Sequence, residues 1–301
     1  MATATNKKIV LVTGGTAGLG LKCCLALAKQ PNMHVILTSR NRQRVDEAVA
    51  KVEVVADASS IVEGGLLDLA SLASVRIYAN SILDRKLELF AIVCNAGVVL
   101  NTNILTADGF EETFETNHLG HFLLVALLRD HSQRIVVIAS ETHDPAEKTG
   151  VPEPNVSDLD QLARGYEPFN GMQAYSTSKL CNVLFTKEFA RRYPKGPRIL
   201  VYTPGFTPDT NILRENHWLR VLVFKWMIRL RLWIVGVRVS TSKYSGGYMA
   251  KLAADEPLTP DYPTGAYIRV DKPGEVSAQA QDPVLAKELW EKSEIWASVK
   301  D

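Results

Sequence analysis

The sequence predicts an α/β protein built on one doubly wound parallel sheet. Short apolar runs alternate with longer segments of helical periodicity, the pattern of strands that crossover helices bury on both faces. Glycine or small polar residues follow several runs, as expected at the sheet edge where ligands bind. We expect the strand order 3-2-1-4-5-6-7 within a single domain over residues 1–301. The predicted strands are 8–12, 34–38, 61–67, 89–94, 134–139, 198–202 and 265–270.

The first apolar run leads directly into a glycine-rich turn, TGGTAGLG at residues 13–20, and then into a helix over 21–30. Glycines let backbone N–H groups approach a pyrophosphate, and the helix N-terminus adds positive dipole. A turn without function is the alternative, but its position after the first strand favours dinucleotide binding. The candidate cofactor-binding residues here are Gly14, Thr16, Gly18, Leu19 and Gly20.

The second run ends in a basic residue, Arg40, flanked by Ser39 and Asn41. NAD-binding versions of this fold place a carboxylate there for the ribose 2′-hydroxyl. Arg40 can instead pair with a 2′-phosphate, with Ser39 and Asn41 as neighbouring donors. The alternative is a solvated arginine, but arginine at a helix N-terminus opposes the dipole unless an anion binds there. The sequence therefore favours NADP(H) over NAD(H).

The third and fourth runs end in small or acidic residues. Asp68-Leu69 follows the third run, and Asp68 either accepts from an adenine amino group or caps the helix of Ser71–Leu83; both interpretations stay open. Asn95-Ala96-Gly97 follows the fourth run. Small residues there let the backbone lie against a ligand.

A long helix is predicted over Gly109–Arg129, with Asn117 in its middle. A buried asparagine needs hydrogen-bond partners, and a bond between helices explains it as well as a functional role. His118 and His121 are three apart in this helix, and packing is the favoured interpretation. No metal site is predicted. Ser140 ends the fifth run, which places it at the ligand edge of the sheet.

Tyr175 and Lys179 are four residues apart and share one face of a predicted helix. A free phenol titrates near pH ~10 and exchanges protons poorly at neutral pH. A nearby ammonium and a cationic nicotinamide ring would favour the phenolate; lowering the pKa by about 3 units takes about 4 kcal/mol. Alone, this spacing is most often a surface lysine beside a tyrosine at the core edge.

Two segments beside this helix are predicted to be irregular. Residues 141–172 are rich in Pro, Gly, Asp and Glu, and long loops in compact domains are often lids or mobile segments. Pro204-Gly205 and Thr207 follow the sixth run at the same sheet edge. The chain then closes with a helix over 244–254 and an exposed charged helix over 283–298.

The segment 214–243 carries Trp218, Trp226 and Trp233 at helical spacing, with seven Lys/Arg against one acidic residue. Three interpretations compete: a substrate lid within an insertion at 206–243, a helix packed on the body or a second subunit, and a basic amphipathic helix on a membrane surface.

Composition excludes other classes of protein. The formal net charge of +1 argues against a nucleic-acid surface. The four cysteines form no CxxC pair, and reduced thiols in the cytoplasm are the expectation. The N-terminus lacks the pattern of a signal peptide, and no uncharged apolar run is long enough to span a bilayer.

Together these motifs resemble the short-chain dehydrogenase/reductase family over residues 8 to 210. They are TGGTAGLG, Asn95-Ala96-Gly97, Asn117, Ser140, Tyr175-xxx-Lys179 and Pro204-Gly205, in this order. The stretches 108–111, 116–122 and 175–182 resemble the branch that contains retinol dehydrogenases, WW-domain oxidoreductases and light-dependent protochlorophyllide reductase. The resemblance implies a Rossmann fold and an NADP(H)-dependent oxidoreductase.

The resemblance also implies roles for single residues. Tyr175 would be the acid/base, Lys179 would lower its pKa and hold the nicotinamide ribose, and Ser140 would hydrogen-bond the substrate carbonyl. Asn117 would hold a water of the proton relay. Pro204, Gly205 and Thr207 would contact the nicotinamide carboxamide. Subunits of this family commonly pair through the helices that correspond here to 109–129 and 173–193, so a homodimer or homotetramer is expected.

The chain departs from the family pattern at two places. Ala17 stands where a basic residue often precedes Gly18, so the 2′-phosphate prediction depends on Arg40. The interval from Ser140 to Tyr175 is longer than usual. We expect a carbonyl or alcohol group on a bulky apolar molecule as substrate; a pigment double-bond reductase and a catalytically silent NADP(H)-binding scaffold are the alternatives.

Overall fold

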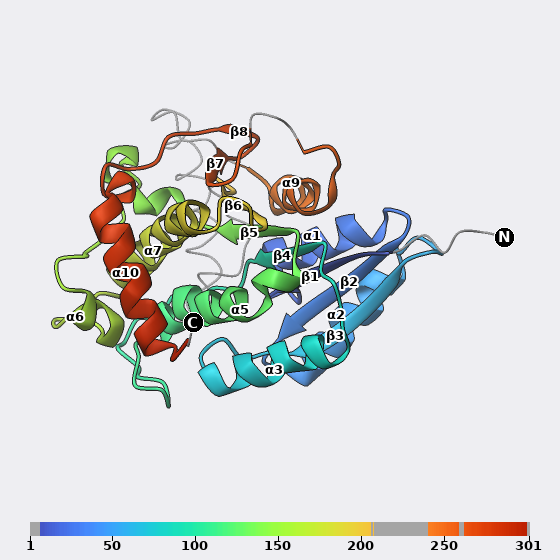
Figure 1. Cartoon of the computed structure of the whole chain (residues 1–301), viewed down its shortest axis with the longest axis horizontal. Coiled ribbons are helices and arrows are strands. Elements are labelled where there is room, and N and C mark those ends of the chain that lie inside the picture. The colour runs from blue at the N-terminus through green and yellow to red at the C-terminus, as the bar shows by residue number, and fades with distance from the viewer. Residues whose placement is uncertain (1–6, 206, 208–239, 259–261, 300–301) are drawn as a thin grey trace, which may run out of the picture.

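Eight strands form one sheet in the computed structural model, which describes residues 7–205, 207, 240–258 and 262–299. Their order is β3-β2-β1-β4-β5-β6-β7-β8 (Figure 1). Neighbours from β3 to β7 are parallel, and β8 is antiparallel to β7. The predicted order 3-2-1-4-5-6-7 is therefore confirmed. The strands are β1 (Lys8–Thr13), β2 (Met33–Ser39), β3 (Ile61–Leu66), β4 (Ala91–Cys94), β5 (Arg134–Ile138), β6 (Arg198–Thr203), β7 (Ala266–Arg269) and β8 (Lys272–Pro273).

Helices cover both faces of the sheet, so the fold is doubly wound. Buried residues of α3, α5, α7 and α10 form one hydrophobic cluster, and those of α1, α2 and α9 form a second. The helices are α1 (Gly18–Ala28), α2 (Arg42–Glu53), α3 (Leu72–Asp84), α4 (Glu112–Phe114), α5 (Gly120–Leu128), α6 (Leu159–Arg164), α7 (Gly171–Arg192), α9 (Ser242–Ala254) and α10 (Pro283–Trp296). A π-helical turn, η1, spans Glu115–Leu119, and short 3-10 turns span Arg129–His131, Glu141–His143, Pro145–Glu147 and Gln279–Gln281.

The prediction of one regular helix over 109–129 is wrong. Gly109 has φ +84°, which a right-handed helix does not adopt. The Glu111 carboxylate accepts hydrogen bonds from the N–H groups of Thr113 and Phe114 at 2.9 and 2.7 Å, so the helix begins only at Glu112. The π-turn η1 then interrupts it, and π-turns of this kind often occur at functional sites.

The C-terminal helix is also more buried than predicted. In α10, Leu289 and Trp290 are 1% and 3% exposed, and Trp290 packs edge-on against Phe122 with ring centroids 5.0 Å apart. Its ring also stacks near Phe185 of α7. The charged residues of this helix suggested exposure, but they occupy one face while the apolar residues of the other face cover α7.

The predicted irregular segment 141–172 contains η3 (Glu141–His143), η4 (Pro145–Glu147) and α6. Of the predicted insertion at 206–243, all but Thr207 and residues 240–243 lies outside the described residues. The prediction of a lid, a packing helix or a membrane-surface helix at 214–243 falls there too. Within the part of the chain that the structure describes, no helix is both long and apolar enough to cross a membrane.

Candidate active site

The predicted site residues meet at one edge of the sheet because they follow parallel strands. The glycine turn follows β1, Asn95 follows β4, Ser140 follows β5, and Gly205 follows β6. Parallel neighbours bring these carboxyl ends together. Figure 1 shows α7, which carries Tyr175, alongside β5 and β6.

The glycine turn has no room for side chains. A Cβ added to Gly14, which has φ +64°, would lie 2.9 Å from the Ala96 Cα, and one added to Gly20 would lie 2.4 Å from the Gly14 carbonyl oxygen. Gly18 has φ +52° and begins α1. The residue before it, Ala17, supplies no side-chain cap, and the first turn holds no acidic residue. The N–H groups of the first turn of α1, and the helix dipole, are therefore available to a phosphate.

Thr13 and Asn95 hold this turn against β4. The Thr13 hydroxyl accepts hydrogen bonds from the N–H groups of Asn95 and Ala96 at 2.9 and 3.0 Å, and it bonds to the His121 Nε2 at 2.8 Å. The Asn95 amide donates to the Thr13 carbonyl at 2.8 Å. Sequence reasoning did not assign a role to Thr13; a polar residue ending a buried strand was the available signal.

Ser140, Tyr175 and Lys179 converge at the opposite end of the site. The Ser140 hydroxyl lies close enough to the Tyr175 phenol to lower its pKa. The Lys179 Nζ lies 5.6 Å from the centre of the Tyr175 ring and donates to the Ile138 carbonyl at 3.1 Å. Lys179 is 4% exposed. Ser140 follows β5, and Tyr175 and Lys179 share one face of α7, as their four-residue spacing predicted.

Burial shifts the pKa values of Lys179 and Tyr175. Burial lowers the pKa of Lys179 to about 8. Tyr175 is partly exposed, yet desolvation of its hydroxyl raises the pKa of the phenol, against the lowering effect of the Ser140 hydroxyl. The expected lowering is therefore not produced by the protein's own groups, and the phenol is held in its neutral, proton-donating form.

Hydrogen bonds of the Asn117 side chain join η1 to the segment after β4 and to α7. It is fully buried in η1. Its amide oxygen accepts from the Val98 N–H at 2.8 Å, and its amide nitrogen donates to the Val98 carbonyl at 3.0 Å and to the Ser178 hydroxyl at 2.9 Å. Both ends of the amide are thus used by the protein. The role of Asn117 in holding a water stays a prediction.

The predicted packing role of the two histidines is confirmed. His121 is 1% exposed, bonds to Thr13, and its Nδ1 bonds to the Asn117 carbonyl at 3.1 Å. His118 lies among aromatic rings, with the Phe114 centroid 5.4 Å away, and burial lowers its pKa to about 4. Of the two rings, His121 contacts Thr13 and Asn117, whereas His118 packs in the aromatic cluster beneath α10.

At the end of β2, the predicted 2′-phosphate residues already have partners. The Arg40 Nη1 donates to the Glu112 Oε1 at 3.0 Å. The Asn41 side chain caps α2 by accepting from the Arg44 N–H at 2.9 Å. Ser39 accepts from the Asn41 N–H at 3.4 Å. Of these residues, Arg40 carries the positive charge that a phosphate requires.

One of the two interpretations of Asp68 is wrong. Ser71, not Asp68, caps α3, because its hydroxyl accepts from the Ser74 N–H. The Asp68 carboxylate instead accepts from the Ala70 N–H at 3.1 Å, which leaves the adenine contact as the prediction for Asp68. Leu69 packs on the start of α5, where a Cβ on Gly120 would lie 2.4 Å from the Leu69 carbonyl oxygen.

The remaining predicted residues lie after β6. The Pro204 carbonyl accepts from the Ser245 hydroxyl of α9 at 2.9 Å. Gly205 has φ +74°, so the chain turns sharply at the end of the strand. Thr207 is described, but the segment that follows it is not.

An ion-pair group that the sequence did not reveal holds the segment after Ser140. The Arg269 Nε donates to the Glu141 carboxylate at 2.7 Å, and its two Nη atoms donate to the Glu147 carboxylate, each at 2.6 Å. The His143 Nδ1 donates to the Ser140 carbonyl at 2.7 Å. Arg269 is 128 residues from Glu141 along the chain, so no local pattern could have paired them.

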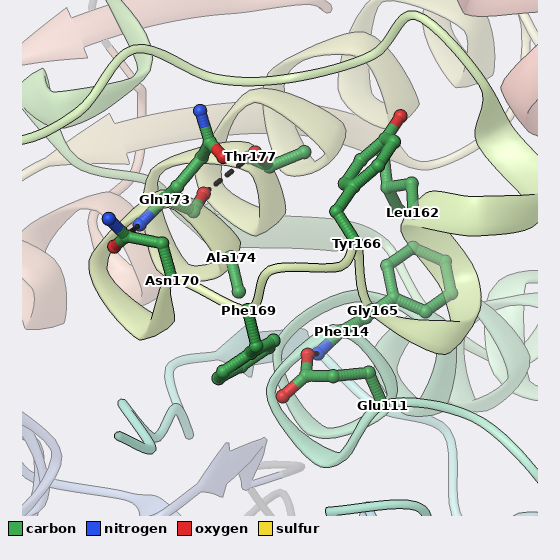
Figure 2. Close-up of a pocket in the computed structure, with 10 residues that line it drawn as sticks. All are labelled: Glu111, Phe114, Leu162, Gly165, Tyr166, Phe169, Asn170, Gln173, Ala174 and Thr177. Atoms are coloured by element: carbon green, nitrogen blue, oxygen red, sulfur yellow. Dashed lines mark hydrogen bonds between the residues drawn. The ribbon is translucent and has the colours of Figure 1, made fainter. Parts of the chain in front are cut away.

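A small cavity lies beside the start of α7, and Figure 2 shows its lining. Its volume of about 20 Å³ suits one water molecule. Neither Ser140 nor Tyr175 is among the residues that line it, and it is too small for a bulky substrate. It is lined by Glu111, Phe114, Leu162, Gly165, Tyr166, Phe169, Asn170, Gln173, Ala174 and Thr177.

The fold and the site define an α/β oxidoreductase of the dinucleotide-binding class, and comparison with known proteins gives the family. The family model for short chain dehydrogenase matches residues 8–150. The WW domain-containing oxidoreductase of Danio rerio is 36% identical over 96% of this chain and 68% of that protein. Protochlorophyllide reductase A of Triticum aestivum is 32% identical over 95% of this chain and 79% of that protein. The chain belongs to the short-chain dehydrogenase/reductase family.

Solved structures agree on the fold. A putative uncharacterized protein from Mycobacterium paratuberculosis superimposes with a TM-score of 0.73 at 27% identity, over 97% of this chain and 94% of that chain. L-sorbose reductase from Gluconobacter frateurii superimposes with a TM-score of 0.66 at 18% identity, over 90% of this chain and 97% of that chain. The predicted family and fold class are thus confirmed.

Proposed function

We propose that the protein is an NADP(H)-dependent oxidoreductase that interconverts a carbonyl and an alcohol group on a bulky apolar substrate. The observation that carries this proposal is the position of the buried Lys179 Nζ, 5.6 Å from the centre of the Tyr175 ring, at the end of β5 where Ser140 lies near the phenol. Two adjacent hydroxyls can both reach one carbonyl oxygen, and that oxygen gains negative charge during reduction.

The residues of the sheet edge fit a nicotinamide dinucleotide. Gly14 and Gly20 let the turn pack closely against neighbouring protein atoms, with which a Cβ would clash, and the first turn of α1 from Gly18 offers its N–H groups to the pyrophosphate. Asn95, Ala96 and Gly97 would lie against the cofactor, Pro204 to Thr207 would hold its nicotinamide end, and Lys179 would hold the ribose. When bound, the cofactor supplies or takes the hydride.

The chain's own residues then handle the proton. In the reducing direction, Ser140 donates a hydrogen bond to the substrate oxygen, and neutral Tyr175 donates its proton as charge develops there. The raised pKa of Tyr175 keeps that proton in place. Lys179, held by the Ile138 carbonyl, stabilises the phenolate that remains. In the oxidising direction the same groups take the proton back.

The preference for NADP(H) is supported by Arg40 at the end of β2, where NAD-binding forms of the fold carry a carboxylate. Guanidinium groups bind phosphates through short, charge-assisted hydrogen bonds. The experiment is a screen of ketones, aldehydes and alcohols with the purified protein, followed as absorbance of NADPH and, in parallel, of NADH. Turnover of bulky apolar carbonyls with NADPH is the expected result; tight NADPH binding with no turnover on any substrate supports the silent scaffold instead.

A second candidate function is reduction of a pigment double bond, because several relatives at 32% identity are protochlorophyllide reductases. In that reaction Tyr175 would protonate a carbon atom rather than an oxygen. Light-dependent turnover of a porphyrin-type pigment, with a matching change in pigment absorbance, would favour it; turnover of ketones in the dark would favour the carbonyl reaction.

Three further proposals concern the oligomeric state, the cellular location and the segment 214–243. We expect a homodimer or homotetramer through the faces of α5 and α7, which light scattering would reveal. We also expect a cytoplasmic protein, with 214–243 covering the substrate, packing on the body or a second subunit, or touching a membrane surface. Co-sedimentation with anionic vesicles distinguishes the last role from the other two.

A further inference from the structure

The residue that the 2′-phosphate prediction depends on is held by a carboxylate from a distant part of the chain. Arg40 follows β2, and Glu112 begins α4, 72 residues later. One hydrogen bond joins them: the Arg40 Nη1 donates to the Glu112 Oε1 at 3.0 Å. The Arg40 side chain is 56% exposed and the Glu112 side chain only 17%. Glu112 is thus the more fixed partner of the two.

The geometry of this pair allows a second anion on Arg40. A guanidinium presents five N–H donors in a planar fork, and one contact to Glu112 leaves most of them for a phosphate. Glu112 therefore has two opposite effects. Its hydrogen bond fixes the Arg40 side chain at the sheet edge, and its negative charge offsets the positive charge that a 2′-phosphate would meet.

The acidic residues on either side of Glu112 have raised pKa values. Glu115, fully buried in η1, has its pKa raised to about 8, mainly by burial and further by Asp108 and Asp68. Glu111 is buried beside Glu112, and burial raises its pKa as well. Raised pKa values leave Glu115 and Glu111 with less negative charge near neutral pH. The carboxylate that contacts Arg40, and whose charge a 2′-phosphate on Arg40 would meet, is that of Glu112.

We propose that Glu112 sets the coenzyme selectivity of this protein: it positions Arg40 for a 2′-phosphate and at the same time limits how strongly Arg40 favours NADP(H) over NAD(H). This inference rests on the proposed NADP(H) function. Glu112 acts through Arg40 and is a positioning residue, not a catalytic one.

The test uses Glu112→Gln, because glutamine keeps an oxygen for the Arg40 bond and removes the charge. Dissociation constants for NADPH and NADH are measured by fluorescence titration with the full chain. We expect Glu112→Gln to bind NADPH about threefold to fivefold more tightly and NADH unchanged, in line with the strength of exposed ion pairs. Glu112→Ala also removes the tether, so its gain for NADPH should be smaller than that of the glutamine variant.

The matched control is Asp46→Asn, which removes one negative charge from α2 at a residue paired with Arg42. It should leave the NADPH/NADH ratio unchanged. An unchanged ratio in Glu112→Gln, weaker NADPH binding in Glu112→Gln, or an equal or larger gain in the alanine variant overturns the inference. Equal losses of both cofactors in Arg40→Gln would instead overturn the NADP(H) proposal, so the two failures are distinguishable.

Discussion

The two ends of the candidate cofactor site are built in different ways. At the nicotinamide end, Lys179 and Asn117 are buried and bonded to backbone atoms of neighbouring elements. At the adenine end, Arg40 is more than half exposed and bonded to another side chain, Glu112. Buried groups held by backbone carbonyls keep one geometry, whereas an exposed ion pair contributes little and exchanges partners easily. We infer that the first end fixes the reaction and the second adjusts the choice of cofactor.

The largest expected effect is at the nicotinamide end. Tyr175→Phe removes the proton donor and leaves the ring in place. Turnover should fall by about 10²-fold to 10⁴-fold, while the NADPH dissociation constant stays nearly unchanged. Steady-state rates and fluorescence titration measure the two quantities. A variant that keeps most of its activity would assign the proton transfer to another group.

Lys179 should make stability depend on pH. Its pKa is lowered to about 8 in the fold from 10.5, so the unfolded chain binds more protons between these values and stability rises with pH across that window. Deprotonation of Lys179 across this window raises the free energy of unfolding by about 3 kcal/mol. Buried cysteines with raised pKa act in the opposite direction. The measurement is therefore the difference in the free energy of unfolding by urea between wild type and Lys179→Met. No change in that difference from pH 8 to 10.5 would contradict the assignment.

At the adenine end, we expect a substitution to weaken NADPH binding and to leave NADH binding unchanged. Arg40→Asp replaces the cation with a group that repels a 2′-phosphate and accepts from ribose hydroxyls. NADPH should bind about 10-fold to 100-fold more weakly, and NADH about as before. Arg42→Asp is the matched control, since it makes the same charge change two residues away. Equal losses for both cofactors would refute the 2′-phosphate role.

The smallest expected effect is at Thr13, which joins the glycine turn to the residues after β4. Thr13→Val keeps the shape but removes the hydroxyl that accepts from the Asn95 and Ala96 N–H groups. The free energy of unfolding should fall by about 1 to 3 kcal/mol because buried N–H groups lose their partner. Thr13→Ser keeps the hydroxyl and should lose less. Identical stability of the two variants would show that the hydroxyl is not what holds the turn.

The sequence predicted the parts of the molecule that depend on local patterns. Apolar runs predicted the strands, glycines predicted the tight turn at Gly14 and Gly20, and a four-residue spacing placed Tyr175 beside Lys179. Each of these needs only neighbours along the chain. The fold confirms them, and the functional roles of these residues stay predictions.

Features that depend on distant partners were not predicted. The π-turn that interrupts 109–129 contains Asn117, which bonds to the distant residues Val98 and Ser178. The pairing of Arg40 with Glu112 joins residues 72 positions apart. The raised pKa of Tyr175 arises from burial in the folded chain. Sequence periodicity carries no information about such contacts.

A crystal structure of the protein with NADP⁺ tests the central claim most directly. We predict that the pyrophosphate lies on the first turn of α1 at Gly18 and that the nicotinamide ring lies within reach of the Ser140 and Tyr175 hydroxyls, with the ribose on Lys179. A dinucleotide bound elsewhere, or a nicotinamide ring remote from both hydroxyls, would contradict the account.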